Sequence, residues 1–405
     1  MIWIEGSCSK NVIFDRKGLD VSMKKYFIFQ PSEEGSFHGE WGQCLSGIID
    51  TAKNALRPVK LNVFISVSET PDYISIRQEV LKSVIDAFGD RAPAVSVTVH
   101  PPQRPRKVTV EALFLASAPG EAVTKYFKSL PYVVINTAWG KEVWGAGLGS
   151  GFFSGDIRKA SENAFDQAVA LLSEEGMALD NIIRQWNYIG NILEIRNGFQ
   201  HYQVFNEVRS EYYARHRSVT GYPAATGIGM KAESVIIDFC AVQPEGSVNI
   251  KGLSNPNQVN AYEYRQNVLK GVKDSGKSMK QPPQFERALI MASGGKAVLY
   301  VSGTASIIGQ ATIGKNDVSE QTLVTLENIK KLTDAERISQ VLSGSAGYSL
   351  KFSLLRVYVK NQDDFAKVRR ICEEHFPDVP AVFIEADVCR KDLLTEIEAE
   401  VQISY

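Results

Sequence analysis

The chain has little of what would mark a disulfide-stapled, metal-binding or membrane-spanning protein. Its five cysteines are scattered, odd in number and without CxxC spacing, which argues against a disulfide framework and against a cysteine-rich zinc site. Its five histidines show no HxH or HExxH spacing, so we expect no metal site. No run of 18 or more apolar residues is present, so no membrane-spanning helix is expected either.

The charges are balanced, with 45 Lys and Arg residues against 46 Asp and Glu residues. A protein that binds nucleic acid by neutralising phosphates carries a basic excess, so nucleic acid is not an expected partner. The first residues lack a basic segment followed by an apolar one, so no signal peptide is expected and the predicted compartment is the cytoplasm. With 405 residues, the chain is long enough for two or three domains of about 150 residues.

Three segments of the chain follow one plan. Each has a strand, a helix, a Pro-Ala pair that opens a second strand, and a closing strand that carries a carboxylate. From proline to carboxylate the spacings are 18, 15 and 18 residues. This shared order indicates a threefold internal repeat. The proline and carboxylate of the three segments are Pro93 and Glu111, Pro223 and Asp238, and Pro380 and Glu398.

The repeat predicts an α+β fold in which each unit, about 115 residues long, is a β-sheet with two helices on one face. We predict a degenerate N-terminal unit over residues 1–118, a middle unit over 130–243 and a C-terminal unit over 284–405. Residues 116–130 and 243–283 are predicted linkers, and the length of the second makes it a candidate for function as well as a solvated insertion. In the C-terminal unit the predicted strands are Ala297–Ile307, Ser349–Val359, Pro380–Ile384 and Leu394–Val401, and the predicted helices are Val318–Leu332 and 365–376.

The C-terminal unit resembles a known superfamily. Three of its runs, VLYVSGTASI (298–307), FSLLRVYVKNQDDFAKVRRICEEHF (352–376) and PAVFIEADVCRKDLLTEIEAE (380–400), look like those of the Rid (YjgF/endoribonuclease L-PSP, RutC-like) proteins. Members of that superfamily have a small chorismate-mutase-like fold and assemble as trimers with ligand pockets between subunits. Three such units in one chain therefore imply an intramolecular pseudo-trimer, present as a monomer or a weak homo-oligomer, whose pockets can diverge.

A narrower resemblance is to the chorismatases, two-part relatives of the Rid proteins that remove pyruvate from chorismate. It implies a small anionic, chorismate-like ligand, and a hydroxybenzoate or dihydroxycyclohexadiene carboxylate as product, with no cofactor and no metal. The predicted site is the cleft where Gly221–Gly229 and Ser302–Gly309 meet. The segments that carry the resemblance are QWN (185–187), HYQVFNEVRSEYY (201–213), GYPAATGIG (221–229), NPNQV (255–259), FERA (285–288), SGTASIIG (302–309) and VCRKDLL (388–394).

Candidates for substrate binding follow from the chemistry of a cyclic dianion. The planar guanidinium of arginine suits carboxylates, and tyrosine offers a hydroxyl donor beside a flat apolar face. The resemblance selects Arg209 and Arg287, although an ion pair with a neighbouring glutamate on the same helix is an equal alternative for Arg209. The remaining candidates are Tyr202, Tyr212, Tyr222, Ala224, Ala225, Thr304 and Ala311.

The proton donor is where the chain departs from the resemblance. A chorismatase is expected to carry a glutamate shortly after the SGTASI run, and this chain has Ala311 there. Asp238 and Glu398 are therefore the predicted catalytic carboxyls, with hydrogen bonding at the strand ends as their alternative role. Two hypotheses stay open: a chorismatase-like enzyme, and a non-catalytic or differently catalytic binder of a similar metabolite.

Imine deamination, the classical Rid activity, is disfavoured. That activity relies on an arginine directly after the Pro-Ala pair, which would anchor the carboxylate of an imino acid. The matching positions in this chain are Val95, Ala225 and Val382.

Overall fold

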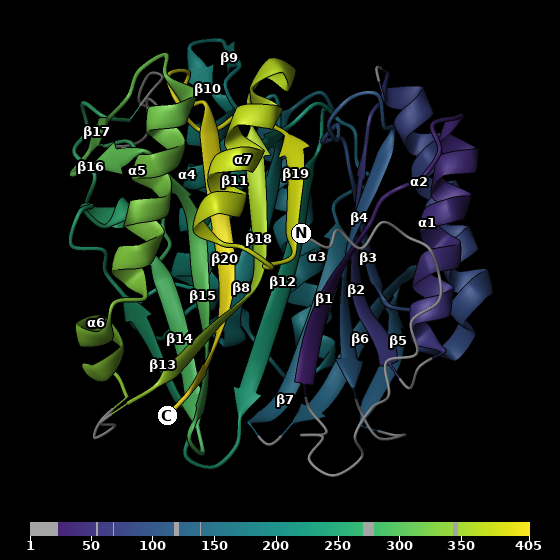
Figure 1. Ribbon diagram of the computed structural model, residues 1–405, viewed down its shortest axis with the longest axis horizontal. Coiled ribbons are helices and arrows are strands. Elements are labelled where there is room, and N and C mark those ends of the chain that lie inside the picture. The colour runs from purple at the N-terminus through teal and green to yellow at the C-terminus, as the bar shows by residue number, and fades with distance from the viewer. Residues whose placement is uncertain are drawn as a thin grey trace.

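The computed structural model describes residues 23–53, 56–67, 69–116, 121–137, 139–269, 279–342 and 347–405. Cys8 and the N-terminal residues on which the signal-peptide prediction rests lie outside these ranges. The described chain forms three large β-sheets with their long helices on the outside, as Figure 1 shows. No helix in the described ranges is long and apolar enough to cross a membrane.

The N-terminal unit is a four-stranded sheet with the order β1-β4-β2-β3. Its first helix begins at Ser36, whose hydroxyl accepts a hydrogen bond from the Gly39 backbone N–H, as an N-cap does. That helix buries Trp41, Cys44 and Ile48 on one side. The elements are β1 (Met23–Phe29), α1 (Phe37–Ala52), β2 (Leu56–Ile65), α2 (Thr70–Phe88), the 3₁₀ turn Gly89–Arg91, β3 (Ala94–Thr98) and β4 (Val108–Ala116).

The middle unit is a six-stranded sheet with the order β11-β8-β12-β7-β6-β5. Asp156 caps its first helix by accepting hydrogen bonds from the Arg158 and Lys159 backbone N–H groups. The elements are β5 (Ala122–Phe127), β6 (Leu130–Thr137), β7 (Gly140–Leu148), α3 (Ile157–Glu174), the 3₁₀ turn Leu179–Asn181, β8 (Ile182–Gly190), the small hairpin β9 (Ile195–Arg196) and β10 (Phe199–Gln200), α4 (His201–His216), β11 (Ala224–Met230) and β12 (Val235–Pro244).

The C-terminal unit is also six-stranded, with the order β13-β14-β15-β20-β18-β19. Its helix α5 is capped by Asp317 in the same way as α3 is by Asp156. The elements are β13 (Asn249–Leu253), the 3₁₀ turn Ala261–Glu263, β14 (Ala288–Ser293), β15 (Lys296–Ala305), the small hairpin β16 (Ile307–Ile308) and β17 (Ala311–Thr312), α5 (Val318–Leu332), α6 (Ala335–Ser339), β18 (Ser349–Val359), the 3₁₀ turn Gln362–Asp364, α7 (Phe365–His375), β19 (Ala381–Glu385) and β20 (Thr395–Ser404).

The three units share one strand pattern, which confirms the predicted tandem units. In each, a central strand (β2, β8 or β18) pairs in parallel with the strand after the second helix and antiparallel with the closing strand. Parallel pairing requires a crossover, and α2, α4 and α7 supply it. The N-terminal unit has four strands where the others have six, in agreement with its degenerate sequence.

The predicted linkers need a correction, because each contains a strand. β5 lies within residues 116–130 and β13 within residues 243–283, and both occupy the edge of a sheet. Edge strands are half exposed: β5 buries only its first and last residues fully, so its sequence lacks a continuous apolar run. That mixed composition is why the pattern resembled a linker.

The units pack around a common centre, and each seam between two units contains a buried ion pair. β3 packs on β6 and β7, β11 packs on β15, and β19 packs on β4, which joins the units pairwise. Burying a charge is costly unless an opposite charge meets it, so these pairs make each seam specific. The pairs are Lys60 with Asp238 at 2.8 Å, Arg184 with Glu398 at 2.7 Å, and Arg356 with Glu111 at 2.6 Å.

Candidate functional site

The three seams differ in how much space they leave. At the seam between the N-terminal and middle units, Tyr73 packs edge-on against Phe153 at 5.8 Å, and its hydroxyl donates to the Val97 carbonyl. The neighbouring Arg77 donates to the Ser150 hydroxyl at 2.7 Å. These side chains pack together across that seam.

The seam between the C-terminal and N-terminal units is occupied by the Pro-rich loop 101–107. The Glu385 backbone N–H donates to the Pro101 carbonyl at 2.7 Å, and the Gln362 side-chain amide donates to the Pro102 carbonyl at 3.1 Å. The loop therefore packs against β19 and the turn before α7. A broad hollow beside it is lined by groups such as His38, which pairs with Glu79 at 2.6 Å.

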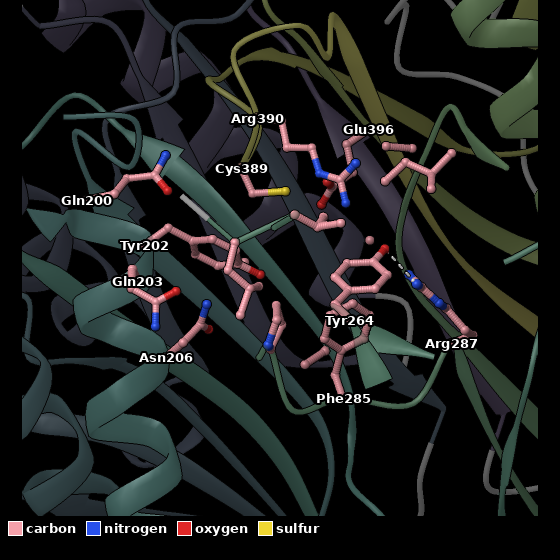
Figure 2. Close-up of a pocket in the computed structure, with 18 residues that line it drawn as sticks. Gln200, Tyr202, Gln203, Asn206, Tyr264, Phe285, Arg287, Cys389, Arg390 and Glu396 are labelled. Atoms are coloured by element: carbon pink, nitrogen blue, oxygen red, sulfur yellow. Dashed lines mark hydrogen bonds between the residues drawn. The ribbon is translucent and has the colours of Figure 1, made fainter. Parts of the chain in front are cut away.

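The seam between the middle and C-terminal units holds a pocket, which we call the seam pocket (Figure 2). The middle unit contributes residues of α4 and β11, the C-terminal unit contributes residues of β15 and β20, and residues within 264–269 and 283–287, between β13 and β14, line another side. Its lining residues are Gln200, Tyr202, Gln203, Asn206, Ala225, Gly227, Tyr264, Val268, Leu269, Pro283, Phe285, Arg287, Gly303, Ala305, Ile307, Cys389, Arg390 and Glu396.

Helix α4 is suited to line a pocket because it buries polar as well as apolar side chains. Val204, Phe205 and Val208 face the core, whereas Gln203 and Asn206 are also buried. A helix that is buried on two sides shows no single apolar stripe. The polar side is covered by the segment after β13: the Gln203 amide donates to the Gln281 carbonyl at 3.2 Å.

Two arginines and a tyrosine form the cationic wall of the seam pocket. Arg287 Nη2 donates to the Tyr264 hydroxyl at 2.8 Å and to the Val259 carbonyl at 2.5 Å. Arg390 Nη1 donates to the Gln310 carbonyl at 2.8 Å, and both guanidinium groups lie over the Tyr264 ring, at 5.5 and 5.3 Å from its centroid. Among the described residues, nothing accepts a hydrogen bond from the buried Arg287 Nε or Arg390 Nη2.

Glu396 supplies the carboxyl group of the pocket. It lies on β20, where its carboxyl rests against the backbone of Gly303: a Cβ atom at Gly303 would lie only 2.1 Å from Glu396 Oε1. Burial, and secondarily the charge of Glu398, raise the pKa of Glu396 to about 8. At neutral pH the group is therefore a carboxylic acid with a proton to give.

Two further pocket groups stay neutral at physiological pH. Burial raises the pKa of the Cys389 thiol to about 12, and burial likewise raises the pKa of the Tyr202 hydroxyl. A thiol is a poor nucleophile, because the thiolate is the reactive form. Cys389 and Tyr202 are therefore suited to packing and hydrogen bonding against a ligand, beside the apolar Phe285 and Leu269.

Three of the nine predicted binding residues line the seam pocket: Tyr202, Ala225 and Arg287. Gly227 and Gly303, from the two motifs predicted to meet, line it as well. The motifs come together because Ala225 donates its backbone N–H to the Ser302 hydroxyl at 2.9 Å. The structure thus contains a pocket in the cleft expected from the sequence.

The other predicted binding residues lie outside the pocket lining. Arg209 is behind it, where its Nη2 donates to Asn206 Oδ1 at 2.7 Å. Tyr212 packs between α3 and α4, stacked on Phe165 at 5.0 Å, because its ring faces the core of the middle unit. Thr304 turns away on β15 and donates to the Ser302 carbonyl at 2.8 Å.

Tyr222, Ala224 and Ala311 also lie apart from the pocket lining. Tyr222 stacks on Tyr213 at 5.9 Å, and Ala224 forms an isolated bridge with Glu286. Ala311 lies exposed on the β16–β17 hairpin. The position at which a proton donor was expected from the resemblance therefore does not face this pocket.

The two predicted catalytic carboxyl groups are both held in ion pairs at the seams between units. Asp238 pairs with Lys60 and accepts a hydrogen bond from the Gly147 backbone N–H at 2.8 Å. Glu398 is held by Arg184 and Arg356. Neither lines the pocket, because each is held in a buried ion pair at a seam.

The sequence reasoning missed Glu396, Tyr264 and Arg390. The repeat directed attention to the carboxylate that all units share, whereas Glu396 matches Thr109 and Ile236 in the other two. That contrast was itself a usable signal, because a titratable residue that only one repeat carries is a candidate for a specialised site. Arg390 belongs to the VCRKDLL segment, in which no side chain was assigned a role, and Tyr264 lies in the predicted linker.

Comparison with known proteins agrees with this architecture. The family model "Chorismatase FkbO/Hyg5-like, N-terminal" matches residues 144–241. A 3-hydroxybenzoate synthase of Streptomyces hygroscopicus is 33% identical over 256 residues, which cover 61% of this chain and 71% of that protein. A chorismatase of Streptomyces rapamycinicus is 33% identical over 227 residues, or 55% of this chain and 64% of that protein.

Further matches concern the fold and the single unit. The crystal structure of a chorismatase superposes with a TM-score of 0.62 at 19% identity, over 95% of this chain and 100% of that one. A RutC family protein of Pyrococcus horikoshii is 35% identical over 105 residues, which are 25% of this chain and 75% of that protein. The fold and the pocket thus define a tandem Rid-like protein with a pocket between two of its units. Within that class, the chain belongs to the chorismatase family.

Proposed function

We propose that the protein cleaves chorismate to pyruvate and a hydroxybenzoate in the seam pocket. The observation that carries the proposal is Glu396, a carboxyl whose pKa is raised to about 8 by burial, in one pocket with Arg287 and Arg390. A proton donor beside cationic anchors is what an anionic enol ether requires. The relatives that are named for chorismate cleavage and for 3-hydroxybenzoate synthesis support the same assignment.

Recognition of the substrate rests on the two guanidinium groups. Chorismate carries two carboxylates, and the unpartnered Arg287 Nε and Arg390 Nη2 are buried donors that a carboxylate would satisfy. The Tyr264 ring between them holds both planes in place before the ligand arrives. Phe285 and Leu269 provide apolar surface for the ring.

The chemistry begins with a proton transfer. Glu396 gives its proton to the methylene carbon of the enolpyruvyl group, which leaves a cationic centre at the ether carbon. The bond between the ring carbon and the ether oxygen then breaks, its electron pair stays on that oxygen, and pyruvate leaves. The ring fragment loses a proton as it becomes aromatic, and this proton restores the Glu396 carboxyl.

This balance distinguishes the two candidate products. Pyruvate and a hydroxybenzoate together have the composition of chorismate, so no water is consumed. A dihydroxycyclohexadiene carboxylate would require one water molecule. We favour the first outcome because Phe285, Leu269 and Ile307 give the pocket an apolar lining and the 3-hydroxybenzoate synthase is among its relatives. Neither step transfers electrons to a cofactor.

Binding without turnover is the less favoured alternative. Its support was Ala311, but Ala311 lies outside the pocket and Glu396 offers the missing acid. We further propose that the chain acts as a cytoplasmic monomer, since it contains its own three units. Sedimentation equilibrium would test the monomer, and a mass of two chains or more would contradict it.

The deciding experiment follows pyruvate release from chorismate with lactate dehydrogenase as the coupling enzyme. We expect turnover by the wild type and a loss of at least a hundredfold in the Glu396→Gln variant, in line with removal of a general acid. Running the reaction in ¹⁸O-labelled water should give a hydroxybenzoate whose ring oxygen is unlabelled. Absence of pyruvate, with chorismate binding intact by calorimetry, would leave a binding protein instead.

A further inference from the structure

Glu398 lies two residues after Glu396 on β20, so both side chains point to the same face of the sheet. The Glu398 carboxylate accepts hydrogen bonds from Arg184 Nη2 and Trp186 Nε1, both at 2.7 Å. It also pairs with Arg356 Nη1 at 2.8 Å. Although burial opposes its ionisation, these partners hold the pKa of Glu398 below its usual range. A fixed negative charge thus lies beside the acid of the seam pocket.

Thr226 connects this charge to the position of Glu396. Its hydroxyl accepts hydrogen bonds from Arg184 Nη2 at 2.8 Å and from the Gly303 backbone N–H at 3.1 Å, and it donates to Glu398. Gly303 is the residue against which the Glu396 carboxyl rests. One hydroxyl therefore ties β11 of the middle unit to β15 and β20 of the C-terminal unit.

We propose that the Arg184–Glu398 ion pair, together with Thr226, is a positioning device for Glu396: it closes the seam and supplies the negative charge that keeps the neighbouring carboxyl protonated. Glu398 is a positioning residue, since it does not line the pocket. The proposal rests on the function proposed above, because it assigns Glu396 the role of acid. It links assembly of the two units to the proton that the reaction uses.

The charges around Glu396 act in opposite directions. After burial, the neighbouring anion that raises its pKa is Glu398, whereas Arg184 and Arg287 lower it. Without Glu398, burial alone would oppose these cations, so the pKa of the Glu396 carboxyl would fall. The ionisable groups that face Glu396 from the surrounding elements are Glu398 on β20, Arg184 on β8, Tyr202 on α4, Tyr264 and Arg287 before β14, and Cys389 and Arg390 after β19.

The test compares variants that remove one charge at a time. Glu398→Gln keeps the shape of the side chain and removes its charge, so the pH at which Glu396 ionises should fall by about one to two units, from the Coulomb interaction of neighbours on one strand face. Arg184→Gln should move it upward. The double variant, Glu398→Gln with Arg184→Gln, retains the charge balance in the seam. The pH at which its Glu396 ionises should lie between the values of the two single variants.

The readout does not depend on chorismate. The infrared absorption of protonated carboxyl groups is followed against pH, and the spectrum of Glu396→Gln is subtracted to isolate Glu396. The acid-dependent limb of pyruvate release should shift in parallel. If the infrared titration shifts as stated but pyruvate is never released, this inference stands and the proposed function falls.

Three results would overturn the inference. One is a folded Glu398→Gln protein in which Glu396 titrates as in the wild type. Another is an Arg184→Gln protein in which Glu396 ionises at a lower pH than in the wild type. If Glu398→Gln does not fold, Arg184→Gln and the double variant provide the test. The last concerns Thr226. Thr226→Ser, which keeps the hydroxyl, should release pyruvate at the wild-type rate, whereas Thr226→Val should release it at least tenfold more slowly. Equal rates of pyruvate release by these two variants would contradict the role of the Thr226 hydroxyl.

Discussion

Replacing Glu396 by Gln should stabilise the protein increasingly as the pH rises. In the unfolded chain this glutamate ionises near its ordinary pKa of 4.5, whereas burial raises the pKa to about 8 in the folded chain. The folded wild type therefore binds a proton that the unfolded chain has already lost, and stability decreases between these two pH values. The amide of the Glu396→Gln variant does not titrate, so the variant escapes that loss.

The size of the effect follows from the difference between the two pKa values. At about 1.4 kcal/mol per unit, the interval from 4.5 to about 8 corresponds to about 5 kcal/mol. The free energies of unfolding of the two proteins should be similar at pH 4.5 and should diverge by about this amount at pH 8. Above pH 8 the difference should become constant.

Urea unfolding followed by circular dichroism at half-unit steps of pH measures this difference directly. Glu374→Gln, which removes a solvent-exposed glutamate on α7, is the matched control for a general change of net charge. A difference between wild type and Glu396→Gln that stays flat from pH 4.5 to pH 8 would refute the reasoning. So would a variant that becomes less stable relative to the wild type as the pH rises.

Three further predictions concern the pocket and the seams. Gly303→Ala places a Cβ atom 2.1 Å from Glu396 Oε1, so the acid must move and the turnover number for pyruvate release should fall about a hundredfold with little change in KM; an unaltered turnover number would argue against the placement of Glu396. Arg390→Gln removes a charge-assisted donor, and we expect the KM for chorismate to rise roughly tenfold to a hundredfold, with wild-type KM as the contrary result. Arg356→Met leaves Glu111 buried without its cation and Glu398 with Arg184 as its remaining cation, and should cost about 3 to 5 kcal/mol in urea unfolding, while Arg370→Met, at an exposed pair, should cost less than about 1 kcal/mol.

Much of the fold could be predicted because local patterns specify it. α5 covers Val318–Leu332 and β18 covers Ser349–Val359, the bounds expected from their apolar spacing. The two helices and the buried strands of each unit have strong periodicity, so tertiary contacts reinforce what the local sequence favours. β5 and β13 were missed because a half-exposed edge strand has a mixed composition.

The sequence predicted the location of the candidate site better than the residues that line it. The small-residue motifs around Gly227 and Gly303 indicated the cleft that contains the seam pocket, since close approach of two backbones requires small side chains. Arg209 and Tyr212 lie on the same helix as Tyr202, yet only Tyr202 lines the pocket. α4 is buried on two sides, so its sequence alone does not show which side faces a ligand. That depends on which segment covers each side, and in this protein the segment that carries Tyr264 covers the pocket side.

The amino-acid order by itself determined the threefold architecture, because the Pro-Ala pairs, the closing carboxylates and the helical periodicities are local features that recur along the chain. What it could not determine is the separate role of each carboxyl on β20, where Glu396, Glu398 and Glu400 alternate on one buried face. Whether each carboxyl is an acid or an anion depends on groups brought from other strands. Arg184 and Arg356 hold Glu398 as an anion, whereas Glu396 rests on Gly303 at the edge of a pocket and keeps its proton. Only the packing of the units supplies those neighbours.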